Sequence, residues 1–371
     1  MKFFSMQKEA LVAFGMVGAS LSGVTFISVP GWVGDSQFTY FQVVIGYLIG
    51  YLIVANILLP LYYKLGLTSI YEYLLSRFGK NSHYVGSISF LISRILGASF
   101  RLFLVAIVLQ EFVFNDLGIP FEITVIISIL LIWLYTRRGG IKTIVWTDTI
   151  EPTLLIMAVI LSIYYINDNL GWTLNEFLSS EEFNEYSKIF VTDSFMDRSY
   201  FLKSIIGGAF ITICMTGLDQ DMMQKNLTCK NINEAKKNMI VFSFILTAVT
   251  FLFIVLGALL FIYANQNGVS IPLLDNSPRT DLLFPEIDLR SGLGEFLGIL
   301  FILGLIAAAY SSADSALTSL TTSFCVDILK IDSSKESSIK TRKIIHVLMS
   351  ILLIIVVIIY RYVLDKNVID S

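Results

Sequence analysis

Residues Gly304–Ser319 read GLIAAAYSSADSALTS, and this segment decides the fold. At about 100° per residue, a helix through it gathers small and hydroxyl-bearing side chains on one narrow stripe. The stripe consists of Gly304, Ala308, Ser311, Ser312, Ser315, Ser319 and Thr322. Residues 296–324 are otherwise apolar, and a charged Asp314 in lipid would cost about 2.5–3.5 kcal/mol on insertion scales. The stripe should therefore face protein or a wet cavity.

Two interpretations of the stripe remain open from these residues alone. The hydroxyls of Ser311 and Ser312, with the carbonyl of Ala308 one turn earlier, offer hard oxygen ligands that suit a small, hard cation. Alternatively, small residues simply allow membrane helices to approach closely.

Bulk composition places the chain in a membrane. The chain is 55% hydrophobic and 15% charged, with a mean hydropathy of +0.75, whereas soluble domains are roughly 45–50% apolar and 25% charged. Runs of about 20 apolar residues predict an all-α polytopic membrane protein with about nine transmembrane helices. The runs are 9–29, 41–62, 84–114, 121–136, 147–165, 200–217, 239–264, 294–324 and 342–361.

Charge and cysteine usage exclude other classes. The basic residues are dispersed among short loops, so no nucleic-acid partner is expected. Cys214 and Cys325 fall in apolar runs and Cys229 in a basic loop, which gives no disulfide or metal spacing. The partner that composition implies is the lipid bilayer.

Lysine and arginine occupy every second connection, and this alternation predicts orientation. The basic connections include 64–80, 137–142, 225–237 and 330–343. We expect a multi-pass protein of the plasma (cell inner) membrane with a cytoplasmic N-terminus. The two long outer connections, 166–199 and 265–293, should form short helices or lids, because long loops seldom stay structureless.

Two predicted spans carry glycines near their centres. The first is Gly15–Gly31, and the other contains Gly207 and Gly208, followed by Thr212 and Thr216. Gly-interrupted spans at corresponding places in two halves point to a transporter site built by an inverted repeat. The alternative is that these glycines only pack against neighbouring helices.

Charged residues also enter predicted spans. Arg94 and Arg101 lie seven apart on one helix face and should point into the bundle, because arginine is costly in lipid. Asp148 is a candidate cation ligand or a partner for a loop arginine. The segment Asp219–Lys237 is interpreted as an amphipathic surface helix with a solvated face.

Several motifs together resemble the sodium:solute symporter family, and the resemblance covers essentially the whole chain. They are Gly139-Gly140 through Trp146-Thr147-Asp148, Asp219-Gln220 with Gln224-Lys225, Ala307 through Ser315 ending in Asp327-Ile328, and Ser22 to Phe26 with Pro30-Gly31. A motif set of this kind in its predicted context favours the functional interpretations over simple packing.

The resemblance implies an inverted-repeat bundle of the leucine-transporter type with five plus five helices. The chain is then one transporter domain, 1–371, with a first repeat at about 9–165 and a second at about 200–361. Carried over from the family, a sodium site would use carbonyls of Gly18, Leu21 and Ala308 and hydroxyls of Ser311 and Ser312. A possible second cation site would use Asp148 and Ser315. The expected substrate cavity contains Ser22, Thr25, Arg101, Thr212 and Thr216.

The resemblance has two departures. The chain lacks the helix that the family usually places before core helix one, and it lacks core helix ten, so a partial chain is expected. Glu151-Pro152 follows Asp148 where the family often has a glutamine and no proline. The proline fits the first turn of a helix rather than a kink.

Three classes of function compete. A sodium-coupled symporter of a small organic solute or anion, with Na⁺ as coupling ion and no other cofactor, explains the motifs together. A membrane sensor on the same core is the alternative. An intramembrane hydrolase would need a base beside Ser311 or Ser312, but His83 and His346 lie at inner helix ends, so no enzyme is expected. Sugars, amino acids, carboxylates, vitamins and small anions all remain candidate substrates.

The basic-loop alternation predicts that Lys230 is cytoplasmic. In a background without the three native cysteines, Lys230→Cys should resist a membrane-impermeant thiol reagent in intact cells and react once the cells are permeabilised. Rapid labelling of intact cells would refute the orientation.

Overall fold

A computed structural model describes residues 15–18, 20–21, 23–67, 70–227, 229–274, 277–331 and 336–363. Only the backbone is described at 24, 135–148, 151, 221, 224, 274, 277, 309, 311–312 and 336–338. The described chain is nearly all helical, as predicted. Its one ladder joins β1 (Leu273–Leu274) to β2 (Ser277–Pro278).

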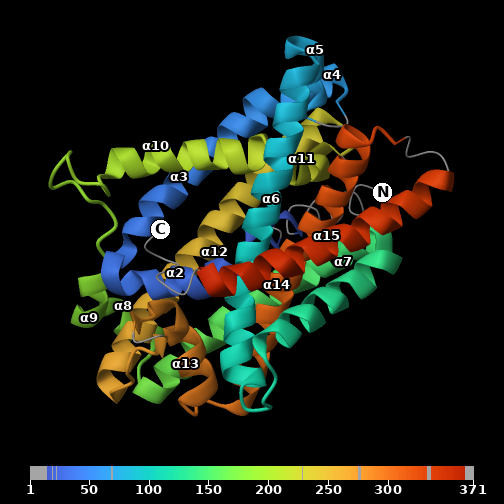
Figure 1. Cartoon of the computed structure of the whole chain (residues 1–371). Helices are drawn as coiled ribbons and strands as arrows, with labels where there is room; N and C mark the ends of the chain where they lie inside the picture. The colour runs from blue at the N-terminus through green and yellow to red at the C-terminus, as the bar shows by residue number, and fades with distance from the viewer. Residues whose placement is uncertain are drawn as a thin grey trace, which may run out of the picture.

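Six helices in the described residues are long and apolar enough to cross a membrane. Figure 1 shows the bundle. In chain order, the elements are α2 (Gly23–Ser36), η1 (Gln37–Thr39), α3 (Tyr40–Ile53), η2 (Val54–Leu58), α4 (Leu59–Leu65), α5 (Glu72–Phe78), α6 (Lys80–Leu109), η3 (Gln110–Phe114), α7 (Phe121–Leu170), α8 (Leu174–Ser179), α9 (Glu181–Tyr186), α10 (Phe201–Thr212), η4 (Ile213–Gly217), α11 (Gln220–Leu227), α12 (Ile232–Asn267), η5 (Thr280–Leu282), α13 (Leu283–Arg290), α14 (Glu295–Ser323), η6 (Phe324–Ile328) and α15 (Glu336–Val363).

Helix α6 shows how a bundle in lipid distributes its side chains. Val85, Ile88, Ile92 and Leu96 are exposed at helical spacing, whereas Leu102 and most residues after it are buried. An apolar stripe facing outward is what a lipid-contacting helix presents, because lipid tails do not penalise it.

Helix α7 is assigned over 50 residues but does not run straight. Thr124 near its start donates to Gln110, beside Glu111. Ser162 near its end contacts Asp288. Arg290, two residues after Asp288, pairs with the same Glu111. Thr124 and Ser162 are therefore both connected to the neighbourhood of Glu111. A straight helix would separate Thr124 and Ser162 by about 57 Å. The chain therefore reverses between them, as the green ribbon does in Figure 1, which agrees with two predicted spans.

The two glycine-containing spans behave differently. The first is interrupted as predicted: Gly15–Gly18 is helical, Leu21 lies in a bend, and α2 begins at Gly23. The predicted break at Gly207-Gly208 is wrong, because α10 continues through both. Its irregular part is the π-helical turn η4, which begins five residues after Gly208.

Gly208 instead allows α10 to approach α3 closely. A β-carbon on Gly208 would collide with the carbonyl oxygen of Val43 and one on Gly46 with that of Ile205, so α3 and α10 meet backbone to backbone. A β-carbon on Gly207 would meet nothing within 4 Å. Small residues at such crossings permit the close van der Waals contact that drives helix association in membranes.

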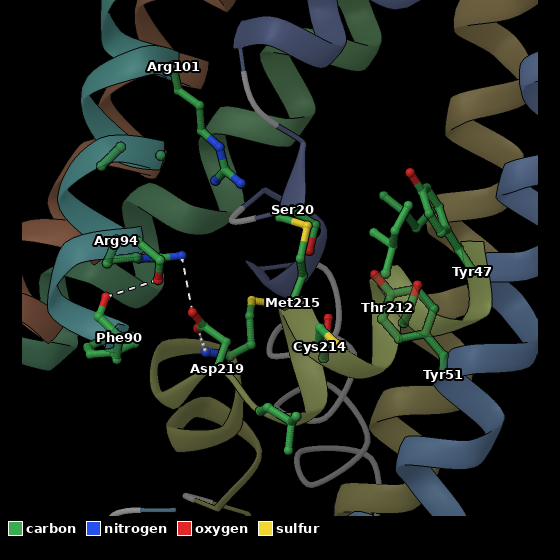
Figure 2. A pocket seen from close by; sticks show the side chains of 18 of the residues that line it. Ser20, Tyr47, Tyr51, Phe90, Arg94, Arg101, Thr212, Cys214, Met215 and Asp219 are labelled. Atoms are coloured by element: carbon green, nitrogen blue, oxygen red, sulfur yellow. Dashed lines mark hydrogen bonds and ion pairs between the residues drawn. The ribbon is translucent and has the colours of Figure 1, made fainter. Parts of the chain in front are cut away.

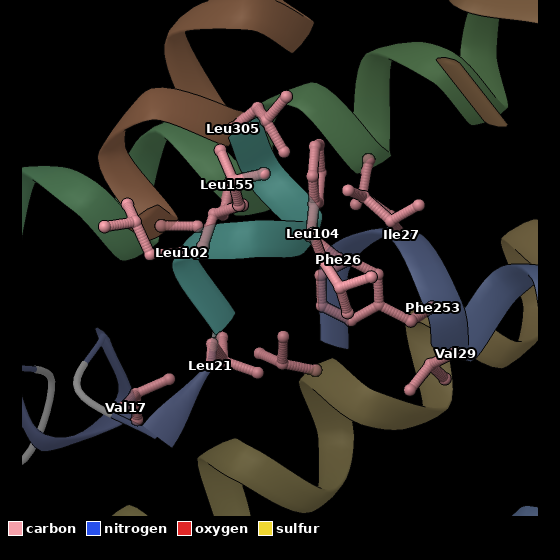
Figure 3. Close-up of a cluster of buried hydrophobic side chains, with 14 of the residues drawn as sticks. Val17, Leu21, Phe26, Ile27, Val29, Leu102, Leu104, Leu155, Phe253 and Leu305 are labelled. Carbon is pink, nitrogen blue, oxygen red and sulfur yellow. The ribbon is translucent and has the colours of Figure 1, made fainter. Parts of the chain in front are cut away.

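An aromatic cluster holds the helices of the core together, and Figure 3 shows two of its members, Phe26 and Phe253, among aliphatic side chains. Phe26 on α2 lies 5.1 Å from the ring centroids of both Phe284 on α13 and Phe301 on α14. Phe253 on α12 adds an edge contact to Phe26 at 6.0 Å. Such offset and edge-to-face pairs contribute about 0.5–1.5 kcal/mol each beyond area burial. The cluster fixes α2 just after its interruption.

Both long connections, 166–199 and 265–293, contain short helices, as predicted. Residues 166–199 include α8 and α9, and α8 begins with a capping box between Thr173 and Glu176. Phe177 is fully buried and anchors α8. Residues 265–293 include η5 and α13, with Leu283, Phe284 and Ile287 fully buried. Both segments therefore pack onto the bundle.

The contrast between adjacent glycines predicts the outcome of a paired substitution. Gly208→Ala should destabilise the protein by about 1–3 kcal/mol, because backbones would have to separate. Gly207→Ala is the matched control and should be nearly neutral or slightly stabilising, since alanine favours the helix. Thermal unfolding in detergent measures both, and equal effects would contradict the close crossing.

Candidate functional site

A cavity of about 620 Å³ opens between α2, α3, α6, α10, η4 and α12. It begins beside the helix interruption at Ser20 and Leu21. Figure 2 shows arginines from α6 on one side of it and tyrosines from α3 on the other. The cavity therefore has a charged wall, an aromatic wall and polar groups between them.

The charged wall carries Arg94 and Arg101. Both line the cavity, so Arg101 faces the bundle interior, in agreement with the prediction. Arg94 Nη1 lies 3.6 Å from Asp219 Oδ2, and both side chains are 14% exposed. Asp219 Oδ1 also accepts the backbone N–H of Met222 at 3.1 Å. In Figure 2 the Arg101 side chain lies above Arg94 on α6 and points toward the cavity. The two arginines are seven residues apart, which is about two helical turns.

The aromatic wall consists of Tyr40, Tyr47 and Tyr51 on α3. The hydroxyls of Tyr40 and Tyr47 are 3.3 Å apart. Sequence reasoning missed this wall, although its signal was available: positions separated by seven and eleven share one helix face. An aromatic face next to a guanidinium pair suits a solute with both apolar and polar surfaces.

Hydroxyl side chains lie between the two walls. Thr25, Thr212 and Thr216 line the cavity, and the two threonines of α10 and η4 are each 3% exposed. The π-helical turn η4 changes the helical register just where Thr216 occurs, and such turns are frequent at functional sites. Ser22 lies outside the described residues.

The residues expected to bind sodium are partly described. Gly18 is helical, Leu21 lines the cavity at the bend, and Ala308 is fully buried on α14. A backbone that leaves the helix frees carbonyl oxygens from intrahelical bonds. The side chains of Ser311 and Ser312 lie outside the described part of the chain.

The second predicted cation site has one described side chain. Ser315 is 3% exposed, and Lys225 Nζ donates to its Oγ at 3.1 Å. Asp314, next to it, is completely buried. The side chain of Asp148 is outside the described residues. A lysine ammonium therefore contacts the predicted second site directly.

The interpretation of Asp219–Lys237 as a solvated surface helix is wrong at its start. Gln220, Met223 and Asn226 on α11 are buried. The hydroxyl of Tyr62 donates to the Gly217 carbonyl at 2.9 Å, just before this segment. A pattern of mixed charge shows that a face is polar but not whether water or protein meets it. Here α4, α6 and α14 meet it.

Apolar helices surround a cavity whose lining carries guanidinium, phenol and hydroxyl groups. Among the residues that the structure describes, no group of three His, Cys, Asp or Glu side chains could hold a metal ion. Guanidinium groups, tyrosines and hydroxyls are groups that bind and orient a solute.

The family model of the sodium:solute symporter family matches residues 8–369, and the chain belongs to this family. This agrees with the resemblance seen in the sequence motifs.

Two relatives and one solved structure show what the chain is similar to. The sodium/sialic acid symporter NanT of Aliivibrio fischeri is 30% identical over 340 residues, covering 89% of this chain and 64% of that protein. SiaT of Proteus mirabilis, also a sodium/sialic acid symporter, is 29% identical over 342 residues, covering 90% and 66%. The chain thus spans just under two thirds of the length of these curated relatives.

The solved structure is of a Na⁺-coupled sialic acid symporter in a substrate-bound, outward-open state. Its TM-score is 0.84 at 25% identity, and the match covers 96% of this chain and 75% of that one. The helical arrangement described above is therefore that of a known transporter fold.

The partly buried Arg94–Asp219 pair predicts non-additive substitutions. Asp219→Leu alone should cost about 1–3 kcal/mol, because it removes a carboxylate that lies beside the Arg94 guanidinium. Combining it with Arg94→Met should recover a coupling energy of about 0.5–3 kcal/mol. Chemical unfolding of the two single variants and the double variant measures this, and strict additivity would contradict the pair.

Proposed function

We propose that the protein is a sodium-coupled symporter that moves a small carboxylate-bearing solute across the plasma membrane by alternating access. The observation that carries this proposal is the cavity, which brings the inward-pointing Arg101 together with an aromatic wall beside an interrupted helix. Membership of the sodium:solute symporter family and the sialic acid symporters among its relatives support the coupling to sodium.

The proposed architecture is an inverted repeat of the leucine-transporter type with about nine membrane helices in this chain. The first repeat is about 9–165 and the second about 200–361, within one domain of residues 1–371. The interruption at Leu21 supports this arrangement, because broken membrane helices occur where they line a site. The N-terminus is proposed to be cytoplasmic on the basis of the basic connections.

The proposed sodium site lies between the interrupted first helix and α14. Its ligands are the carbonyl oxygens of Gly18, Leu21 and Ala308 and the hydroxyls of Ser311 and Ser312. Complete burial of Ala308 and the bend at Leu21 support the site, because a hard cation needs oxygen ligands shielded from competing water.

A second cation is proposed to bind at Asp148 and Ser315. The contact of the Lys225 ammonium with Ser315 sets a condition on this site. Two positive charges a few ångströms apart in a bundle repel each other strongly. A cation at Ser315 therefore requires Lys225 to move away.

The proposed substrate is an anionic, hydroxyl-rich solute of the sialic acid type. A guanidinium can hold a carboxylate through two parallel hydrogen bonds, which Arg101 could provide from the charged wall. Tyr47 and Tyr51 offer an apolar surface on the opposite side. Thr212 and Thr216 can exchange hydrogen bonds with substrate hydroxyls. The names of NanT and SiaT make sialic acid the first substrate to test.

Sodium-driven uptake of radiolabelled sialic acid by the intact gene product, in cells lacking other sialic acid transporters, tests the proposal. Uptake should require an inward sodium gradient and stop when potassium replaces sodium. Equal uptake in both salts, from cells that contain the protein, would overturn sodium coupling.

Arg101 should determine recognition of the carboxylate. Arg101→Lys keeps the charge but loses the paired hydrogen bonds, so the KM for the solute should rise by about tenfold or more, in line with about 1.5–3 kcal/mol for a hydrogen bond to a charged group. Arg290→Lys on α13, whose side chain is about half exposed, is the matched control and should leave KM unchanged. Equal KM values for the wild type and Arg101→Lys would remove Arg101 from substrate recognition.

Ser311 and Ser312 should set the sodium requirement. Ser311→Ala and Ser312→Ala each delete one oxygen ligand while keeping a small side chain, so the sodium concentration for half-maximal uptake should rise. Sodium and solute must enhance each other's binding reciprocally. Ser319→Ala is the control, because Ser319 donates to the Ala316 carbonyl within α14. An unchanged sodium dependence in the first two variants would favour a packing role.

A further inference from the structure

The connection between α12 and α14 forms a cap, defined here as η5 and α13 (residues 280–290). Phe284 seats it on Phe26 and Phe301 at centroid distances of 5.1 and 4.9 Å. Leu283 and Ile287 are also fully buried. The cap therefore packs on the core through apolar contacts. A polar group buried in this contact needs a compensating partner.

Asp288 is such a group. The residue is 3% exposed, and its Oδ2 lies 2.6 Å from the Oγ of Ser162 on α7. Its Oδ1 is buried and has no hydrogen-bond partner among the described residues. Burial raises the pKa of the Asp288 carboxyl well above its usual range, and the Ser162 hydroxyl only partly opposes this. An ionised carboxylate in this position would be poorly compensated.

The hydrogen-bond count at Ser162 supports the same conclusion. Its Oγ lies 2.8 Å from the Ala158 carbonyl oxygen, which can only accept, as well as 2.6 Å from Asp288. A serine hydroxyl has one proton, so it cannot fully donate in both directions. If Asp288 carries a proton, it donates to Ser162 Oγ, and Ser162 donates to Ala158. This assignment satisfies both short contacts.

A second buried acid in the cap, Asp281, is compensated by a positive charge. Asp281 is also 3% exposed, but both its oxygens accept from Arg279, at 3.0 and 2.9 Å. A bidentate guanidinium compensates a buried carboxylate. The hydrogen-bond partner of Asp288 is the neutral hydroxyl of Ser162, whereas the partner of Asp281 is the positively charged guanidinium of Arg279.

Among the described residues, no charged side chain on the surrounding elements forms a described contact with Asp288. Arg290 on α13 pairs with Glu286 and with Glu111 on η3, at 3.1 and 3.8 Å. Asp35 on α2, Asp168 on α7 and Glu295 on α14 have no described contact with Asp288, and residues 249–267 of α12 contain no charged side chain. Burial and Ser162 therefore control the charge of Asp288.

We propose that Asp288 is a proton-binding site, at which a neutral carboxylic acid joins the cap to α7 through Ser162. Loss of the proton would place an uncompensated negative charge between the cap and the bundle. A proton that binds the seated cap and not the released one stabilises the seated state by mass action. The site makes the seating of the cap depend on pH, and it requires no assumption about the transported solute.

Infrared spectroscopy of the purified protein tests the protonation directly. At neutral pH, the wild type should show a carboxylic-acid carbonyl band that Asp288→Asn lacks, and Asp281→Asn, the matched control, should retain it. If Asp288→Asn does not fold, Asp288→Glu serves instead, because it should shift the frequency of the same band. A band that neither Asp288 variant alters would overturn the proposal.

The pH dependence of unfolding in detergent is the second test. Between the usual pKa of an aspartate and the raised pKa of Asp288, only the native state holds the proton, so stability falls as pH rises. One such proton changes the folding equilibrium by about tenfold per pH unit. Asp288→Asn should lose this contribution, and Asp281→Asn should keep it. Identical pH profiles for the wild type and Asp288→Asn, or a wild type that gains stability relative to it with rising pH, would overturn the proposal.

Discussion

The structure depends on one constraint: within an apolar bundle, every polar group has to be compensated by another part of the protein. Arg94 on α6 meets Asp219 at the start of α11, and Ser315 on α14 meets Lys225. Each contact joins elements that are distant in the sequence. Polar residues that lipid would exclude thus join distant helices, and one of these pairs, Arg94 and Asp219, lines the cavity.

Backbone contact joins two of the helices that line the cavity. Because Gly46 and Gly208 lack side chains, α3 and α10 cross with almost no space between them. This crossing brings the tyrosines of α3 close to Thr212, which lies beside Tyr51 in Figure 2. Thr216, four residues later, also lines the cavity. The aromatic cluster around Phe26 holds α2 on the other side of the interruption. Close packing and an open site therefore depend on the same helices.

Part of the site was accessible to sequence reasoning and part was not. The cost of arginine in lipid predicted that Arg101 faces inward, and the family resemblance led to Thr25, Thr212 and Thr216, which line the cavity. The role of Asp219 was missed, because a mixed-charge helix looks the same whether water or Arg94 meets its polar face. The break expected at Gly207-Gly208 was wrong, because glycine weakens a helix and also permits close contact, and only a neighbouring helix decides between these effects.

The sequence by itself determined the class of protein, since hydropathy, basic connections and motifs depend on the order of residues and on their transfer from water to lipid. It also predicted the interruption near Leu21 and the short helices between spans, because glycine content and loop length act locally. Only the tertiary structure decided which polar residues compensate one another. The pairing of Asp281 with Arg279, and of Asp288 with Ser162, illustrates the reason: two buried aspartates seven residues apart have identical intrinsic chemistry, and the groups that folding brings to each one set its charge.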